Sequence, residues 1–438
     1  MSAIDHLYAV RVKGIWAYLK TQDILFWLIN IYLFMEYVRP QTIYPSIDLF
    51  PFVAVLLIFT LVVFLFRHNL PLVKNPVNKL LILFFVVILL SSVFALAPKV
   101  AFDKVPEFIT WMIVFFLIIN IVNTEKRFFV FMLAFLLYSF KMAQFSFRQW
   151  MASGFAFMDW GSGGGPGWFH NSGEFGIQMC IFLPLSACFF FALKEHWPRW
   201  KKILFLFFPF AALTGTISSS SRGAVVGVVC VLFFMFMQGK HRLKGLVALG
   251  IILALVYFLM PDQQLERFQS AGKDDTSTSR LIYWERGLEL LSLFPFIGVG
   301  YNNWLVAQKK IFGLDNQQLS HNIFIQCASE LGYIGLLVFI MMILYTFVNN
   351  FRTRKLALQH GWEKKEVKMR FLYYMAYGLD GALVGYLASG FFITVLYYPY
   401  FWINLAMTVS LNAIARKQTG HKESNNNSGL KKVHGFGS

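Results

Sequence analysis

The chain has 438 residues, of which 57% are hydrophobic and only 14% are charged, and its formal net charge is +17. A soluble protein of this length normally divides into two or three domains with far more surface charge, so this composition excludes an ordinary soluble enzyme. Apolar runs of about 20 residues, enough to cross roughly 30 Å of hydrocarbon, recur along the chain and predict an all-α polytopic membrane protein. A membrane β-barrel would instead show short segments of alternating polarity.

Twelve transmembrane helices are predicted from these apolar runs. In chain order they cover about 24–38, 49–66, 79–97, 106–122, 128–146, 174–193, 203–220, 223–238, 244–260, 327–349, 371–396 and 399–414. The chain then divides into an N-terminal arm at 1–23, spans one to nine at 24–260, an outer loop at 261–326, spans ten to twelve at 327–416, and a tail at 417–438. The arm has no clear signal-peptide cleavage site, and the tail has the composition of a disordered segment.

The charges of the loops orient these spans. When the N-terminus is placed inside, 27 of the 39 Lys and Arg residues fall in cytoplasmic segments, and 14 of the 22 Asp and Glu residues fall outside. Lys and Arg are enriched in the cytoplasmic loops of membrane proteins, so both termini are predicted to be cytoplasmic. This bias explains the net charge, and no soluble segment carries the basic stripe that would bind nucleic acid.

Two outer loops are substantial. The first, about 147–173, contains "GSGGGPGW" and is too rich in glycine for a regular helix. The second, 261–326, contains "TSTSRLIYWERGLELL", which predicts an amphipathic helix with a Ser/Thr region at its N-cap. Its aromatic residues favour a position on the membrane surface, and Tyr283 and Glu285 are candidates for contact with a substrate.

Three residues on the outer side are the strongest candidates for chemistry. Arg222, in "ISSSSRGAVVG", lies among small residues where positive charge is scarce, so it either binds an anion such as phosphate or reaches to the lipid headgroups. Arg280 either binds an anion too or forms local ion pairs on a solvated helix face. His321, in "LSHNIFIQCASELG", is the best available general base, with Asn322 and Glu330 near it in sequence.

Other polar residues have two open interpretations each. His170, Asn171 and Glu174, in "GWFHNSGEFG", either face the same outer cavity or form a turn and helix cap. Asp380, in "YGLDGALVG", is either a proton-relay acid or a hydrogen-bonding group inside the bundle. Lys141, within the fifth span, is a candidate partner for Asp380, although nothing in the sequence pairs them.

The remaining motifs exclude several activities. The four cysteines lie in or beside apolar spans without CxxC spacing, so they are interpreted as small core residues. The sequence has no P-loop, no Rossmann glycine fingerprint, and neither HExxH nor G-x-S-x-G. It also lacks a cytoplasmic ATPase domain, which excludes a primary pump.

Three motifs occur in a characteristic order: "SSSSRGAVVG", then "SRLIYWERGLELLSLFPFIGVGYNNW" in the large outer loop, then "LSHNIFIQCASELGYIGLLVF". In this order the chain resembles the O-antigen ligase / O-antigen polymerase superfamily, most closely over about 215–345. The "VRPQTIYP" segment after the first span and the glycine-rich loop are similar to the O-glycosylation ligases associated with exosortase systems.

The resemblance implies a membrane-embedded glycosyltransferase in the bacterial inner membrane, with its active site facing the periplasm. It would transfer a glycan from undecaprenyl pyrophosphate to a hydroxyl of lipid A core, a growing glycan or a protein, without a metal or cofactor. Carried over by motif, Arg222 and Arg280 would bind the donor pyrophosphate, and His321 would activate the acceptor hydroxyl. Direct displacement at the anomeric carbon would invert it.

Two alternatives stay open. A polymerase of the same superfamily would join lipid-linked repeat units instead of transferring them to a different acceptor. A secondary transporter or lipid flippase belongs to another class and would be favoured by inverted repeats with broken spans in both halves. The sequence shows no such symmetry, and its outer loop is large for a transporter.

Overall fold

The computed structural model describes residues 7–44, 51–67, 72–156, 161–165, 167–238, 242–260, 262–270, 272, 275–315, 318–360 and 366–420. Within these ranges every regular element is a helix. Six of the described helices are long and apolar enough to cross a membrane: α6 (Pro76–Val93), α7 (Pro98–Ile121), α8 (Glu125–Ala152), α9 (Ser172–Leu193, continued by the 3-10 turn η2, Lys194–His196), α10 (Arg199–Ser218) and α16 (Ile323–Gln359). The predicted all-α polytopic membrane protein is therefore confirmed.

The other six predicted spans also fall on helices. These are α3 (Ile24–Tyr37), α5 (Phe52–Leu65), α11 (Arg222–Met237), α12 (Arg242–Leu259), α17 (Val367–Gly390) and α18 (Pro399–Gln418). Because α3 and α5 have 14 residues and α11 has 16, each is shorter than a full span of about 20 residues. The count of twelve transmembrane helices therefore stays a prediction.

The remaining described helices are short or belong to the predicted non-membrane segments. They are α2 (Val12–Lys20) in the N-terminal arm, α4 (Pro40–Ile43), and α13 (Asp262–Gln269), α14 (Asp275–Leu293) and α15 (Trp304–Lys310) in the predicted outer loop. The predicted helix of the outer loop is present as α14, and Thr276 and Ser277 lie within its described range, which begins directly after residues that lie outside the described ranges. The tail after Gly420 lies outside the described residues.

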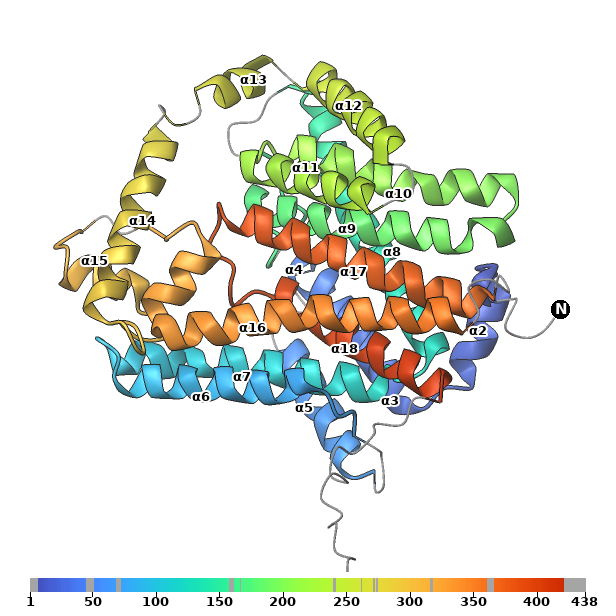
Figure 1. Ribbon diagram of the computed structural model, residues 1–438, viewed down its shortest axis with the longest axis horizontal. Coiled ribbons are helices and arrows are strands. Elements are labelled where there is room, and N and C mark those ends of the chain that lie inside the picture. Colours follow the sequence, from blue (N-terminus) through green and yellow to red (C-terminus); the bar gives the residue numbers. More distant parts are fainter. Residues whose placement is uncertain are drawn as a thin grey trace, which may run out of the picture.

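The long helices run side by side along the longest dimension of the molecule (Figure 1). In this view α14 and α15 cover the left end of the bundle, whereas α2 lies at the right end. The α13 helix crosses the top between α12 and α14, so the outer segments form an arch over one end of the bundle. In this view the predicted outer helices α14 and α15 lie at the end opposite the predicted inner helix α2.

Helix α9 forms the centre of this bundle and is buried on almost all sides against α8, α10, α11 and α17. Its closest neighbour is α17, whose glycines let the two backbones approach. A side chain at Gly381 would come within 2.7 Å of Pro184, and one at Gly385 within 2.8 Å of the Cys180 carbonyl oxygen. Small residues at such contacts are the usual means of packing helices in membranes.

Helix α16 is broken at Gly332, where the backbone takes φ 67 and ψ −171. The segment after α14 fills this break, because the Val299 amide donates to the Ser329 carbonyl at 2.8 Å and the Tyr333 amide donates to the Pro295 carbonyl at 2.7 Å. The buried Glu330 carboxylate accepts a hydrogen bond from the Tyr397 hydroxyl at 2.8 Å. Glu330 therefore fixes the break in the helix and does not contact His321.

Asp380 is a buried bundle residue whose partner differs from the predicted one. Its carboxylate pairs with the Arg354 guanidinium and accepts from the Asn350 amide at 2.8 Å. A buried carboxylate is stable only when it is paired and hydrogen-bonded, and both conditions are met here. Pairing of Asp380 with Lys141 is thus wrong, and the hydrogen-bonding interpretation of Asp380 is the one that the contacts support.

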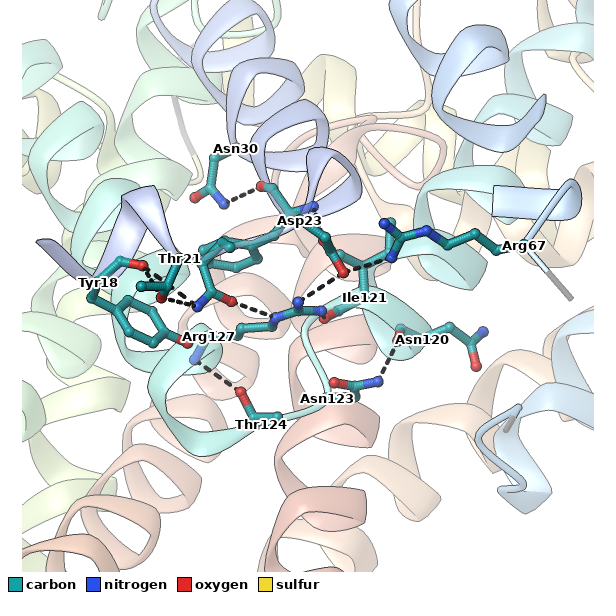
Figure 2. Close-up of polar contacts among 12 residues, drawn as sticks. Tyr18, Thr21, Asp23, Asn30, Arg67, Asn120, Ile121, Asn123, Thr124 and Arg127 are labelled. Carbon is teal, nitrogen blue, oxygen red and sulfur yellow. Dashed lines mark hydrogen bonds and ion pairs between the residues drawn. The ribbon is translucent and has the colours of Figure 1, made fainter. Parts of the chain in front are cut away.

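A polar cluster around Asp23 joins four helices, α3, α5, α7 and α8, at the predicted cytoplasmic end (Figure 2). Asp23 caps α3 by accepting from the Phe26 amide at 3.0 Å, and it forms ion pairs with Arg67 at 2.7 Å and Arg127 at 3.0 Å. Arg127 also donates to the Ile121 carbonyl at 3.0 Å. The cluster ties the starts of α3 and α8 to the ends of α5 and α7.

Candidate functional site

A cavity of about 1260 Å³ lies among α4, α8, α9, α11, α14 and the segments that precede α16 and α18. Small-molecule sites are usually about 300–1,000 Å³, so this cavity has room for an extended substrate. Its charged and titratable lining residues are Lys141, Arg148, His170, Glu174, Arg222, Arg280 and His321. Among the lining residues that the structure describes, four basic side chains stand against one carboxylate, and this excess of positive charge favours an anionic ligand.

The hairpin between α10 and α11 positions Arg222. The Ser219 hydroxyl accepts from the Ser221 amide at 3.3 Å, so the chain reverses within three residues. Ser220 takes a left-handed backbone conformation (φ 53), and Ser221 caps α11 by accepting from the Ala224 amide at 3.3 Å. Arg222 is the first residue of α11, so its guanidinium adds to the positive end of the helix dipole, where anions bind favourably.

The first serine of this stretch, Ser218, joins the hairpin to the glycine-rich loop and to α8. Its hydroxyl lies 2.7 Å from the Ser146 hydroxyl on α8, and its carbonyl accepts from the Ser162 amide at 3.0 Å. A side chain at Gly161 would lie 1.9 Å from the Ser219 carbonyl oxygen. The four serines therefore build a tight turn with a loop packed against it, which the sequence alone did not explain.

Arg280 reaches the cavity from the N-terminal half of α14. The helix is held by Trp284, whose ring lies 5.0 Å from that of Phe391, and by Gly287, where a side chain would come within 2.2 Å of Ile325. The predicted helix therefore packs against the start of α16 and the turn after α17.

His321 lies at the cavity in the segment before α16 and has a left-handed backbone (φ 49), which is costly for a residue other than glycine. Its amide donates to the Thr394 hydroxyl at 2.8 Å, and this contact fixes the strained turn. Burial and the nearby Arg280 guanidinium lower the pKa of His321 from 6.5 to about 4. Its imidazole is therefore neutral at pH 7, as a general base requires.

His170 and Asn171 line the cavity from the end of the glycine-rich loop. Asn171 is also the N-cap of α9, since its side chain accepts from the Gly173 amide at 2.8 Å while Glu174 accepts from the Asn171 amide at 3.2 Å. Both open interpretations are thus present together: the residues form a capping box, and the capping box faces the cavity.

Three predicted contact residues do not line the cavity. Asn322 is buried and its side chain caps α16 by accepting from the Phe324 amide at 2.8 Å, so its acceptor is already used. Tyr283 packs against the small cluster around Trp304, and Glu285 is exposed. Successive helical residues turn by about 100°, which places Glu285 well away from Arg280 on α14.

Sequence reasoning gave no site role to two basic residues of the cavity, Lys141 and Arg148. With Phe145 they follow a spacing of four and three residues along α8, which places all three on one helix face. The spacing alone predicts that the three side chains share one helix face, but it does not predict that this face borders a cavity. Thr394 was also missed, because its importance depends on contact with a residue 73 positions away.

The "VRPQTIYP" segment contributes to the same wall. Arg39 has a left-handed backbone (φ 48), pairs with Glu36 at 3.4 Å, and lies over the Trp168 ring at 5.7 Å. Thr42 and Ile43, at the end of the α4 helix that follows Arg39, line the cavity. The segment therefore ties the end of α3 to the glycine-rich loop.

Fold and site together define a helical membrane protein with a large cationic cavity at one end of the bundle. Residues 204–340 match the model of a family described as O-Antigen ligase. This segment contains Arg222, Arg280 and His321, so the resemblance of the chain to the O-antigen ligase-like superfamily is confirmed. The proposed exosortase-associated branch stays a prediction.

A curated relative supports the same superfamily over a short region. The chain is 32% identical over 85 residues to the "Exopolysaccharide production protein ExoQ" of Rhizobium meliloti (strain 1021). The alignment covers 17% of this chain and 20% of that relative, so the two proteins are compared over a fifth of the relative's length.

Proposed function

We propose that this chain is a membrane glycosyltransferase of the ligase type. It transfers a glycan from undecaprenyl pyrophosphate to an acceptor hydroxyl, without a metal ion, at the periplasmic face of the bacterial inner membrane. The observation that carries the proposal is the meeting of Arg222, Arg280 and His321 in one cationic cavity, although they come from three separate segments. The family match over the same segments supports the reaction class.

The proposed reaction assigns one task to each side chain. His321 takes the proton of the acceptor hydroxyl, whose oxygen then attacks the anomeric carbon of the donor sugar. The bond between that carbon and the phosphate oxygen breaks, and undecaprenyl pyrophosphate leaves with the bonding electrons. Arg222 and Arg280 stabilise the charge that grows on the pyrophosphate, and attack from the side opposite the leaving group inverts the sugar.

The low pKa of His321 fits this order of events. In the absence of substrate the ring is neutral but weakly basic, because burial and Arg280 disfavour its charged form. A bound pyrophosphate offsets the Arg280 charge and raises the pKa of the ring, so the base becomes stronger when the donor is present.

The test is transfer by purified protein with a lipid-linked donor. Arg222→Ala and Arg280→Ala are each expected to lower kcat by about 10²–10³-fold, and His321→Ala by about 10²–10⁴-fold. Arg286→Ala is the matched control, since Arg286 lies on α14 but contacts Gln308 and Phe312 rather than the cavity. Full activity in any of the three site variants removes that residue from the mechanism, and a strict requirement for a divalent ion contradicts the metal-free reaction.

A second candidate function is that of a polymerase, and it is favoured by the name of the ExoQ relative, which refers to exopolysaccharide production. The two reactions differ only in the acceptor. Incubation with the lipid-linked glycan alone extends the chain if the protein is a polymerase and does not if it is a ligase. Mass spectrometry of the glycoconjugate lost on gene deletion then identifies the acceptor as lipid A core, glycan or protein.

A further inference from the structure

The face of α8 that borders the cavity carries a second group of cations. Lys141, Phe145, Arg148 and Gln149 all line it, and the helical rise places Lys141 about 10 Å from Arg148 along the axis. Both side chains are long enough to reach a single group between them. They are separate from Arg222 and Arg280, which enter from α11 and α14.

Neither side chain is neutralised by the part of the chain that the structure describes. No ion pair to Lys141 or Arg148 occurs among those residues, and the contact of Lys141 is with the Phe145 ring, 5.9 Å from the ammonium nitrogen. Arg127, on the same helix, shows the contrast, because it pairs with Asp23. A lysine within a membrane-spanning helix is costly, and such residues usually serve a ligand or a water-filled cavity.

The position of α8 relative to the catalytic residues is fixed. Ser146, next to Phe145, bonds to Ser218 of the hairpin that carries Arg222. Glu174, the acid among the described lining residues, is held in the capping box of α9 by the Asn171 amide. The α8 face therefore presents positive charge at a set level of the cavity, beside the hairpin.

We propose that Lys141 and Arg148 form a second anion-binding subsite, which holds a phosphate or carboxylate group of a substrate. The chemistry is that of a lysine and an arginine facing one anion, with the arginine able to bind two oxygens at once. The source of the anion rests on the proposed function: it is an acidic group of the acceptor or a phosphate of the donor. The anion site itself does not depend on that function.

The experiment measures transfer with donor and acceptor varied separately, for Lys141→Gln, Arg148→Gln and the double variant in lipid nanodiscs. The KM of one substrate is expected to rise about tenfold per charge removed, with kcat unchanged, because a hydrogen bond to a charged group typically contributes about one factor of ten or more. A rise confined to the acceptor identifies an acidic acceptor, and a rise confined to the donor identifies a donor phosphate. Raised salt should weaken binding by the parent protein more than by the double variant.

Two controls and a second measurement complete the test. Lys141→Arg and Arg148→Lys keep the charge and should keep most of the affinity, and Lys126→Gln removes a charge from α8 away from the cavity. Binding of labelled inorganic pyrophosphate is measured in parallel, so the subsite can be examined even if no transfer occurs. Unchanged KM values together with unchanged pyrophosphate binding in the double variant overturn the proposal, whereas lost binding without any transfer overturns only the proposed function.

Discussion

His321 combines a left-handed backbone conformation with a pKa well below that of an ordinary histidine. Burial and the Arg280 guanidinium both disfavour its protonated ring, so the pKa lies near 4 instead of 6.5. If the neutral ring is the base, kcat/KM should stay flat from pH 7 to about pH 5 and fall about tenfold per pH unit only below about pH 4. Initial rates across this pH range check the expectation, and an inflection near pH 6.5 contradicts it.

The same environment predicts the effect of removing the neighbouring charge. In Arg280→Gln the ring loses one cause of its low pKa, so its titration should move upward towards 6.5. Because this variant transfers slowly, the titration is best followed by the rate at which His321 reacts with diethyl pyrocarbonate, which modifies the neutral ring. Equal profiles for the parent and the variant contradict the coupling.

Thr394 is a positioning residue, since it acts through the His321 backbone. Thr394→Val removes the acceptor of the His321 amide while keeping the shape of the side chain. The strained turn then loses its partner, so kcat should fall at least about tenfold with both KM values unchanged, because small displacements of a catalytic group are costly. Thr394→Ser keeps the hydroxyl and should retain activity; equal losses in the two variants would show that the methyl group matters instead.

At the scale of elements, the hairpin and the glycine-rich loop form one packed unit. Gly161 has φ 62, and a side chain there would meet the Ser219 carbonyl oxygen at 1.9 Å, so Gly161→Ala should separate the loop from the hairpin. Gly154→Ala is the matched control, because Gly154 has φ 70 but open space around it. Both variants bear the left-handed backbone cost of about 1–2 kcal/mol, and only Gly161→Ala should lose more in detergent melting and lose transfer. Equal melting temperatures contradict the packing.

The elements themselves were largely predictable, but their irregularities were not. Continuous apolar runs set the helices, and each predicted span falls on one. The break in α16 depends on Gly332 and on the segment from Pro295 to Val299 that fills the gap, which no local pattern reveals. The side-chain contacts of Asn322 and Glu330 could not be predicted for the same reason, since the sequence does not distinguish a buried polar residue that caps or braces a helix from one that binds a substrate.

At the scale of the molecule, the charge distribution and the fold give a testable topology. Thr21, the C-cap residue of α2, and Ser292, near the end of α14, are both exposed, and Figure 1 shows α2 and α14 at opposite ends of the bundle. In a chain without its four native cysteines, Ser292→Cys should react with an impermeant maleimide in intact spheroplasts, and Thr21→Cys only after the membrane is opened. The reverse pattern would place the cavity in the cytoplasm and exclude a periplasmic reaction.

The site as a whole was only partly predictable. The three motif residues were placed together by resemblance, and the structure places all three at one cavity. The cationic face of α8 was not recognised, because Lys141 and Arg148 lie outside the matched segment of 204–340 and their meeting with the hairpin is a property of the tertiary fold.

The break in α16 also holds the C-terminal end of α14, so movement at this contact would be transmitted along α14. The C-terminal end of α14 is anchored where the following segment bonds to Ser329 and Tyr333, whereas Arg280 lies 13 residues away along the rod, about 20 Å at the helical rise. A rotation of about 5° at the anchor would move Arg280 by roughly 2 Å, more than the 1 Å that is enough to disrupt catalysis. The stiffness of this remote contact, together with the packing of Trp284 against Phe391, therefore determines how accurately the Arg280 guanidinium is positioned.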